Sequence, residues 1–201
     1  MIKVFSSGLL DSNTYVVWSK SGHAMVVDCG NPPEKIIKFI ENERLCVDYI
    51  VLTHAHYDHI AYIDEYAKAY PEAKLVCHKD ELCVINDSEG NLSSYFNAAR
   101  SYVHDYYLVN EDEIISLKDE KSGRSVDFRI IHAPGHTIGC ICLFNEEEKI
   151  MLTGDVLFAN GYGRTDLKYA DPQKMRLTLY RLIPMLKGIT IYPGHGDSTE
   201  F

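Results

Sequence analysis

The alternation of apolar and polar residues predicts β-strands in both halves of the chain. Short runs that are apolar at every second position, or apolar almost throughout, are typical of strands, and turn residues such as Gly, Asn and Ser separate them. The predicted strands cover residues 2–6, 14–18, 24–28, 48–53, 74–78, 113–117, 126–132, 140–145, 149–153 and 190–192. The first three form an antiparallel meander, and the nearly unbroken apolar run 48–53 indicates a strand buried on both faces.

Apolar residues at helical spacing predict helices between these strands. Their stripes are Ile36, Ile37 and Ile40, then Ile60, Ile63 and Ala67, then Met175, Leu179 and Leu182. Asn31 is a candidate N-cap for the first helix, Asp58 and His59 stand in the first turn of the second, and Asp171 caps the third with Pro172 behind it. Strands interleaved with helices favour an α+β architecture, in which two mixed sheets pack together and helices cover them.

Residues 79–105 show no clear period. An aromatic group follows or lies within this stretch: Tyr95, Phe96, Tyr102, Tyr106 and Tyr107. We interpret these side chains as core packing rather than as the wall of a substrate pocket.

Composition narrows the class of protein. The 201 residues are 46% hydrophobic and suffice for one domain with a substantial core, so we expect a single domain over residues 1–201. The formal net charge of −9 disfavours a nucleic-acid partner. Without a long apolar run or a secretory start, we expect a cytoplasmic protein with no membrane partner and a small-molecule substrate. The sequence leaves the oligomeric state open.

The six cysteines include no C-x-x-C pair, and most have apolar neighbours. We therefore expect small buried thiols rather than disulfides or metal ligands.

The chemically most specific stretch is the H-x-H-x-D-H run from His54 to His59, where a buried strand meets a helix. His54 and His56 are two residues apart, so that on an extended backbone their side chains project to one side and reach a single cation. Asp58 and His59 are turned elsewhere by the start of the helix, which lets them serve a second cation close by.

Three later turns have the form of missing ligands. His136 stands in an A-P-G-H turn, Asp155 in a T-G-D turn and His195 in a P-G-H-G turn, each at the end of an apolar strand with glycine beside it. Glycine permits the close backbone approach that a crowded site requires. The chain therefore presents seven candidate metal ligands.

In order and approximate spacing these motifs resemble the metallo-β-lactamase superfamily, over essentially the whole chain. The phrases 154–158, 161–166 and 192–196 are most similar to the glyoxalase II (hydroxyacylglutathione hydrolase) group and its short bacterial members. The resemblance implies an αββα sandwich that binds two divalent metal ions, zinc in the first place and iron or manganese as alternatives. It implies the ligands His54, His56 and His136 for one ion, Asp58, His59 and His195 for the other, and Asp155 as the bridge.

The resemblance also implies a reaction, the hydrolysis of a hydroxyacylglutathione-type thioester by a metal-bridging hydroxide. Two such cations lower the pKa of a shared water and polarise the carbonyl that it attacks. Asp58 is the candidate catalytic residue, because it would orient the hydroxide. Arg164, Tyr162 and Tyr57 are candidate substrate-binding residues, and the alternative for Arg164 is an ion pair with Asp166.

The chain departs from the glyoxalase II pattern in two places. It ends at Phe201, so we expect it to lack the C-terminal helical domain that supplies glutathione-binding groups in full-length glyoxalase II enzymes. Ala61-Tyr62 stands where a pair of small residues often follows the histidine motif.

Two alternatives to the hydrolase hypothesis stay open. One is a persulfide dioxygenase, whose relatives bind a single iron at the positions of His54, His136 and Asp155. The other is a non-catalytic metal-binding module. The metal content of the purified protein separates the dioxygenase from the hydrolase, since one iron and two zinc ions indicate different reactions.

Overall fold

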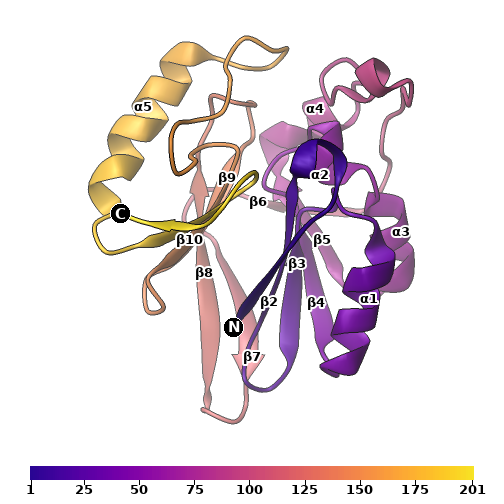
Figure 1. Cartoon of the computed structure of the whole chain (residues 1–201), viewed down its shortest axis with the longest axis vertical. Coiled ribbons are helices and arrows are strands. Elements are labelled where there is room, and N and C mark those ends of the chain that lie inside the picture. The colour runs from indigo at the N-terminus through magenta and orange to yellow at the C-terminus, as the bar shows by residue number, and fades with distance from the viewer.

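Two six-stranded β-sheets pack face to face in the computed structural model of the chain, which describes residues 1–201 (Figure 1). The first sheet has the order β1 (Ile2–Ser6), β2 (Asn13–Trp18), β3 (His23–Val27), β4 (Cys46–Val51), β5 (Lys74–His78) and β6 (Tyr106–Val109). The second has the order β12 (Thr199–Glu200), β11 (Thr190–Pro193), β10 (Ile150–Gly154), β9 (Ile141–Asn145), β8 (Arg124–His132) and β7 (Ile114–Asp119).

Both sheets are mixed. In the first, β1 to β3 form an antiparallel meander, whereas β3 to β6 are parallel. In the second, β7 to β10 are antiparallel and β11 runs parallel to β10. Strands β8, β10 and β11 therefore share one direction, and the turns after their carboxyl ends meet at one edge.

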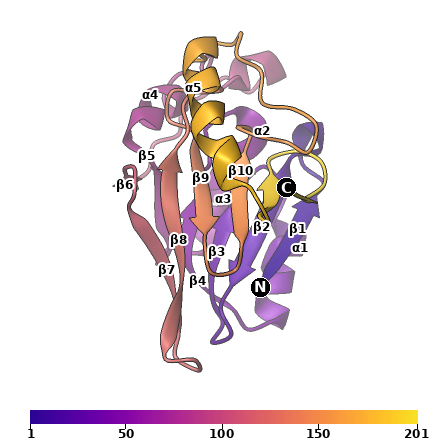
Figure 2. The same ribbon diagram turned by 90° about the vertical axis from the view of Figure 1, so that its left-hand side faces the viewer.

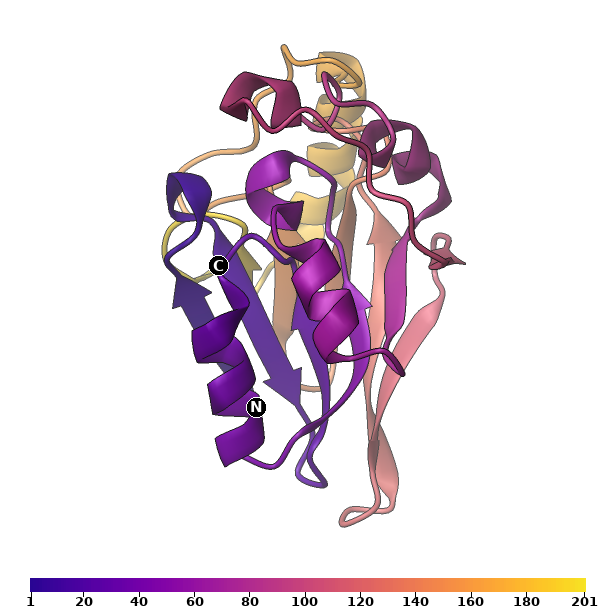
Figure 3. The same ribbon diagram turned by 90° about the vertical axis from the view of Figure 1, so that its right-hand side faces the viewer.

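Helices cover the outer face of each sheet. The α-helices are α1 (Pro33–Asn42), α2 (Tyr57–Ile60), α3 (Ile63–Ala69), α4 (Leu82–Ile85) and α5 (Pro172–Leu182), and the 3-10 turns are η1 (Leu9–Asp11), η2 (Lys79–Glu81), η3 (Ser93–Phe96) and η4 (Ile183–Met185). Helix α5 lies over the second sheet (Figure 2), whereas α1 and α3 lie over the first (Figure 3). None of these helices combines the length and the apolar character that a membrane crossing requires.

The core has three layers because successive side chains of a strand point to opposite faces. On β3, Met25 and Val27 enter the layer between the sheets, whereas Val26 faces the layer under α1 and α3. On β9, Leu143 points into the middle layer and Cys142 points toward α5. The αββα arrangement of the prediction is confirmed, and its period-two strands are what builds it.

All ten predicted strands are present, with ends shifted by up to two residues. Strands β6 and β12 were not predicted. The second predicted helix is two helices, α2 and α3, separated at Ala61 and Tyr62. Asp171 caps α5 through bonds from the backbone N–H groups of Gln173 and Lys174 at 2.8 and 3.0 Å.

Asn31 is not a helix cap, and this prediction was wrong. Pro32 precedes the first turn of α1. The amide of Asn31 instead donates to the carbonyl oxygen of Ser12 at 2.8 Å and to the hydroxyl of Thr14 at 3.0 Å. Asn31 therefore ties the start of α1 to the β1–β2 connection.

The core interpretation of the aromatic group holds only in part. Tyr102 is buried and Tyr106 packs against the same layer, but Tyr95 is 75% exposed and Tyr107 is 48% exposed. Phe96 lies at the surface on η3. Of the six cysteines, Cys46 and Cys83 are also exposed, and all six are free.

Phe128 tests the middle layer. Its side chain is fully buried between the sheets, so we expect Phe128→Ala to lower the free energy of unfolding by about 3–5 kcal/mol. Urea denaturation measures the change. Leu177→Ala on the exposed face of α5 is the control and should change it by less than about 0.5 kcal/mol. Equal effects of the two substitutions would contradict this assignment of the core.

Candidate metal centre

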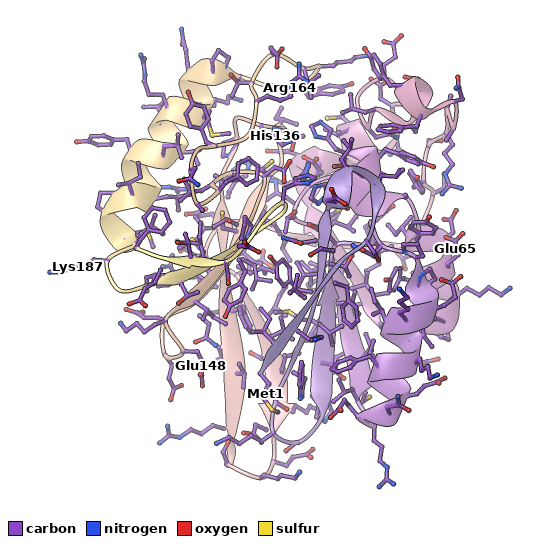
Figure 4. The ribbon with its side chains drawn as sticks, in the orientation of Figure 1. Met1, Glu65, His136, Glu148, Arg164 and Lys187 are labelled. Carbon is purple, nitrogen blue, oxygen red and sulfur yellow. The ribbon has the colours of Figure 1, made fainter.

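The seven predicted ligands come together at one end of the sandwich, between the two sheets. They are His54, His56, Asp58 and His59 after β4, His136 between β8 and β9, Asp155 after β10 and His195 after β11. Figure 4 shows His136 between the two halves of the molecule, with Arg164 on the loop above it. The carboxyl ends of strands from both sheets therefore supply the site.

The first group of donors is His54, His56 and His136, whose candidate ligand atoms all lie within 4.8 Å of one another. All three side chains are buried. The Nε2 atom of each has no hydrogen-bond partner. Buried polar atoms are nearly always paired, so three unpaired nitrogens around one point indicate a missing partner.

The second group is Asp58, His59 and His195, again within 4.8 Å of one another. The Nε2 atoms of His59 and His195 are 3.2 Å apart, and Asp58 Oδ2 lies 3.1 Å from His195 Nε2. Asp155 lies between the groups: its Oδ1 is 3.4 Å from His59 Nε2, and its Oδ2 is 3.5 Å from His136 Nε2. This is the position that the predicted bridging role requires.

Hydrogen bonds to the opposite ring nitrogen fix the orientation of four histidines. The Nδ1 atoms of His54, His59, His136 and His195 pair with Thr53 Oγ1 (3.2 Å), Asp28 Oδ2 (2.9 Å), the Arg164 carbonyl oxygen (2.8 Å) and the Leu10 carbonyl oxygen (3.0 Å). Each bond leaves Nε2 directed at the centre. Metal-binding histidines typically show this arrangement, in which a carbonyl or carboxylate holds the second nitrogen.

Asp28 is a site residue that the sequence analysis missed. It follows β3 in a left-handed conformation (φ 62°) and is buried. Besides holding His59, its carboxylate accepts bonds from the backbone N–H of Thr53 at 2.7 Å and from the Thr53 hydroxyl at 2.8 Å. The sequence did contain a signal, because Asp28 ends an apolar strand two residues before Gly30, and Asp155 likewise ends an apolar strand, directly after Gly154.

Glu81 was also missed. Its buried carboxylate accepts bonds from the Ala55 N–H, the Thr137 hydroxyl and the Gly139 N–H, each at 2.8 Å. Burial raises the pKa of Glu81 to about 7, against the opposing effect of these donors. Glu81 thereby fastens the loop of His56 to the loop of His136. It lies in the stretch without periodicity, where the sequence offered no signal.

The first group is neutral at neutral pH. Burial lowers the pKa of His56 to about 3, and it also lowers the pKa of His54 and of His136. A neutral imidazole has a free lone pair for a metal ion. Protons therefore do not compete for these nitrogens at pH 7.

The second group contains buried anions. Although burial opposes their charge, His59 lowers the pKa of Asp58 and holds that of Asp155 well below its usual value. Conversely, against the effect of burial, the two carboxylates raise the pKa of His59, and Asp58 raises that of His195. The pocket thus demands positive charge near two ionised carboxylates. Divalent cations fit this donor set of imidazoles and carboxylates.

Glycine is required where the turns cross the site. A Cβ atom on Gly194 would lie 2.1 Å from Asp155 Oδ1 and 2.7 Å from His59 Cε1, and one on Gly163 would lie 2.0 Å from the Asp155 carbonyl oxygen. All three distances are shorter than the contacts that real Cβ atoms make. The glycines of the later motifs are therefore part of the site.

The predicted substrate residues lie around the mouth of the site. Arg164 pairs with both carboxylate oxygens of Asp166, at 2.7 and 2.8 Å, which is the alternative considered for it. Tyr162 is 57% exposed. Tyr57 is half-buried and packs on Phe96 with ring centroids 5.3 Å apart. Binding of substrate by these residues stays a prediction.

A cavity of about 540 Å³ lies elsewhere. It opens between the sheets near Met1, Trp18 and Phe128 and contains none of the predicted site residues.

Cys140 is no donor, since it is buried with its Sγ beside the Thr137 hydroxyl at 3.0 Å, and burial raises its pKa well above the usual value.

Comparison with known proteins gives a consistent result. The model of a family described as the metallo-beta-lactamase superfamily matches residues 7–195. Hydroxyacylglutathione hydrolase GloC of Haemophilus influenzae is 28% identical over 201 residues, which cover 98% of this chain and 92% of GloC. The structure of BLEG-1 B3 metallo-beta-lactamase superposes with a TM-score of 0.86 at 28% identity, covering 99% of this chain and 93% of that one. The structure of TTHA1623 in a di-iron-bound form superposes with a TM-score of 0.84 at 27% sequence identity, covering 98% of this chain and 94% of that one.

Asp28 offers a direct test of the arrangement around His59. An Asn at position 28 keeps the size of the side chain but loses the charge that holds the Nδ1–H of His59, so we expect metal affinity to fall about 10–100-fold. Competition with a chromophoric chelator measures the affinity. Asp48→Asn is the matched control, because Asp48 holds His23 at 2.8 Å outside the site. Unchanged affinity and stoichiometry in Asp28→Asn would refute the assigned role.

The buried histidines predict an acid-sensitive metal-free protein. Because the pKa of His56 is about 3 in the folded chain against 6.5 normally, the unfolded chain takes up this proton first as the pH falls. The stability that depends on the neutral ring is complete above pH 6.5 and is lost between pH 6.5 and 3. We expect the urea midpoint of the chelator-treated protein to decrease as the pH is lowered through this window. His56→Asn should reduce the slope of the urea midpoint against pH. His104→Asn, outside the site, should leave the slope unchanged, and an unaltered slope in His56→Asn would show the prediction to be wrong.

Proposed function

The chain belongs to the metallo-β-lactamase superfamily, and we propose that it is a dinuclear metal hydrolase that cleaves thioesters of the hydroxyacylglutathione type. The proposal includes His54, His56 and His136 as ligands of one ion, a second set of Asp58, His59 and His195, and Asp155 as the bridge. It further includes a single domain over residues 1–201, a small-molecule substrate, no nucleic-acid or membrane partner, and a cytoplasmic location.

The observation that carries this proposal is the set of unpaired buried atoms. Nε2 of His54, His56 and His136 and Oδ1 of Asp155 have no hydrogen-bond partner. An unsatisfied buried polar atom costs about 1–3 kcal/mol. Four such atoms beside a second trio of donors support a site built for cations rather than for packing. Because these donors are nitrogen and oxygen only, zinc, iron and manganese are all compatible, and zinc is our first choice.

The site supports hydrolysis without a protein nucleophile. Two divalent ions held by these donors would supply a hydroxide at neutral pH and would polarise the carbonyl under attack. Asp58 is ionised and therefore only accepts hydrogen bonds, so its carboxylate would hold the proton of the attacking group and orient it toward the carbonyl. Asp155 keeps His59 and His136 at fixed distances on either side. The buried frame thus provides orientation.

The comparison with GloC supports the choice of substrate class. GloC is a hydroxyacylglutathione hydrolase by name, and this chain matches 92% of its length. A protein named for that reaction therefore has little chain beyond the matched region. The match over nearly the whole of GloC therefore supports a glutathione thioester as the substrate class.

Metal content and thioester hydrolysis test the proposal together. We expect about two metal ions per chain and hydrolysis of S-lactoylglutathione by the zinc-, iron- or manganese-loaded protein. Because His56→Ala removes a ligand, it should lower kcat/KM at least about a hundredfold. His104→Ala, outside the site, is the control and should stay within about twofold.

Other outcomes would point elsewhere. One iron per chain with oxygen uptake on a persulfide, and no thioester hydrolysis, would replace the proposal by the dioxygenase alternative. Bound metal without activity toward thioesters or persulfides would favour a metal-binding module. Hydrolysis that survives His56→Ala would sink the proposed mechanism.

A further inference from the structure

A cavity of about 520 Å³ opens beside the metal donors, and its lining residues include Leu9, Tyr57 and Ala61. Tyr57 lies between two of the donors in sequence, and Ala61 follows the last of that group by two residues. Leu9 precedes Leu10, whose carbonyl oxygen holds His195 Nδ1 at 3.0 Å. None of the seven donors lines the cavity, but it adjoins the segment that carries His56, Asp58 and His59 and the turn whose carbonyl oxygen holds His195.

The opposite wall is a loop that the chain itself fixes in place. Phe96 on η3 packs on Tyr57 at 5.3 Å between ring centroids. The side chain of Asn91 donates to the carbonyl oxygen of Arg100 at 3.0 Å, and the guanidinium of Arg100 donates to the carbonyl oxygen of Ala61 at 2.9 Å. Figures 1 and 3 place this segment at the same end of the molecule as α2 and α4. A substrate does not have to order this wall, which favours binding.

Seven of the nine lining residues are apolar or aromatic, and the other two, Glu65 and Arg100, are charged. Tyr57, Tyr62 and Phe96 supply three rings, and alanines fill the space between them. The charge of Arg100 is already engaged by Asp64 at 3.3 Å. A cavity of 300–1,000 Å³ with such walls is typical of small-molecule sites, and a lactoyl group would occupy only a small part of it.

Ala61 and Tyr62 stand where a pair of small residues often follows the histidine motif, and the cavity gives this difference a structural role. Both residues line the cavity, and Tyr62 adds an aromatic ring to its wall. Half-buried and exposed aromatic side chains that gather on one surface often mark a ligand-binding groove. The ligand is thus expected to be apolar where it meets them.

We propose that this cavity binds an apolar group of the substrate, the size of an aromatic ring, and that Tyr57, Tyr62 and Phe96 determine specificity for it. The inference rests on the proposed thioesterase function and adds the substrate class. The group belongs to the acyl part or to the thiol part of the thioester, and two arms of one experiment distinguish these sources.

The experiment compares matched thioesters on the metal-loaded protein. In the acyl arm, S-phenylacetylglutathione is compared with S-acetylglutathione, and in the thiol arm, benzyl thioacetate with the S-acetyl ester of 2-mercaptoethanol. We expect the aromatic substrate to be preferred in kcat/KM by about tenfold or more in one arm. Phe96→Ala should abolish most of that preference, measured as the ratio of kcat/KM for the two substrates of each arm.

Tyr95→Ala is the matched control, since Tyr95 is the neighbour of Phe96 on η3, is 75% exposed and does not line the cavity. It should change neither arm. Equal preference for aromatic and small substrates in both arms would overturn the inference, as would the same loss in Tyr95→Ala and Phe96→Ala.

A binding measurement separates this inference from the proposed function. Calorimetry on the zinc-loaded protein compares 2-phenylethanethiol with 2-mercaptoethanol, and we expect the aromatic thiol to bind about tenfold more tightly in the wild type but not in Phe96→Ala. If no thioester is hydrolysed, the proposed function fails and this ratio alone decides. Equal affinities in the wild type would then overturn the inference.

Discussion

Two ionised carboxylates buried between the sheets impose the constraint on which the rest of the structure depends. Asp58 and Asp155 are buried, and no apolar interior stabilises such charges without a partner. Their only nearby positive charges in the protein are the rings of His59 and His195, which the same carboxylates make more basic. A site in this electrostatic state exchanges protons for metal ions readily, because each ion replaces protons that the anions already attract.

The surrounding segments preserve this balance by fixing directions. Asp28, Glu81 and the carbonyl oxygens of Leu10 and Arg164 come from four separate connections, and each holds one donor or one donor-bearing loop. Two of these anchors adopt left-handed backbone conformations, Asp28 at φ 62° and Leu10 at φ 54°. Strained backbone of this kind persists where the surroundings over-determine it, and that is often a functional site. Two of the strained backbone positions of the chain therefore hold metal-site histidines.

The donors and the layers were predictable from the sequence because their signals are local. A strand shows its period within five residues, and His136, Asp155 and His195 each stand beside glycine after a strand end. Asp28 and Glu81 were not identified because their roles depend on partners far along the chain: Asp28 meets His59 across 31 residues, and Glu81 meets Gly139 across 58. The core interpretation of the aromatic group was wrong in part for the same reason. Phe96 contacts Tyr57 only because Asn91 and Arg100 hold the loop that carries Phe96 in place. Helix caps are similarly ambiguous in the sequence. The side chain of Asn31 could have capped α1, but in the fold it bonds to Ser12 and Thr14 instead.

The division of the site between two sheets also has a consequence for biosynthesis. His59 and His195 are 136 residues apart in the chain. At ordinary translation rates of about 5–20 residues per second, His195 is therefore synthesised roughly 7 to 27 seconds after His59. During that interval the nascent chain carries His54, His56, Asp58 and His59 before His195 has been added. Because the seven side chains come from both sheets, they lie together only once the second sheet has docked on the first. The complete site therefore cannot form on a nascent first sheet alone.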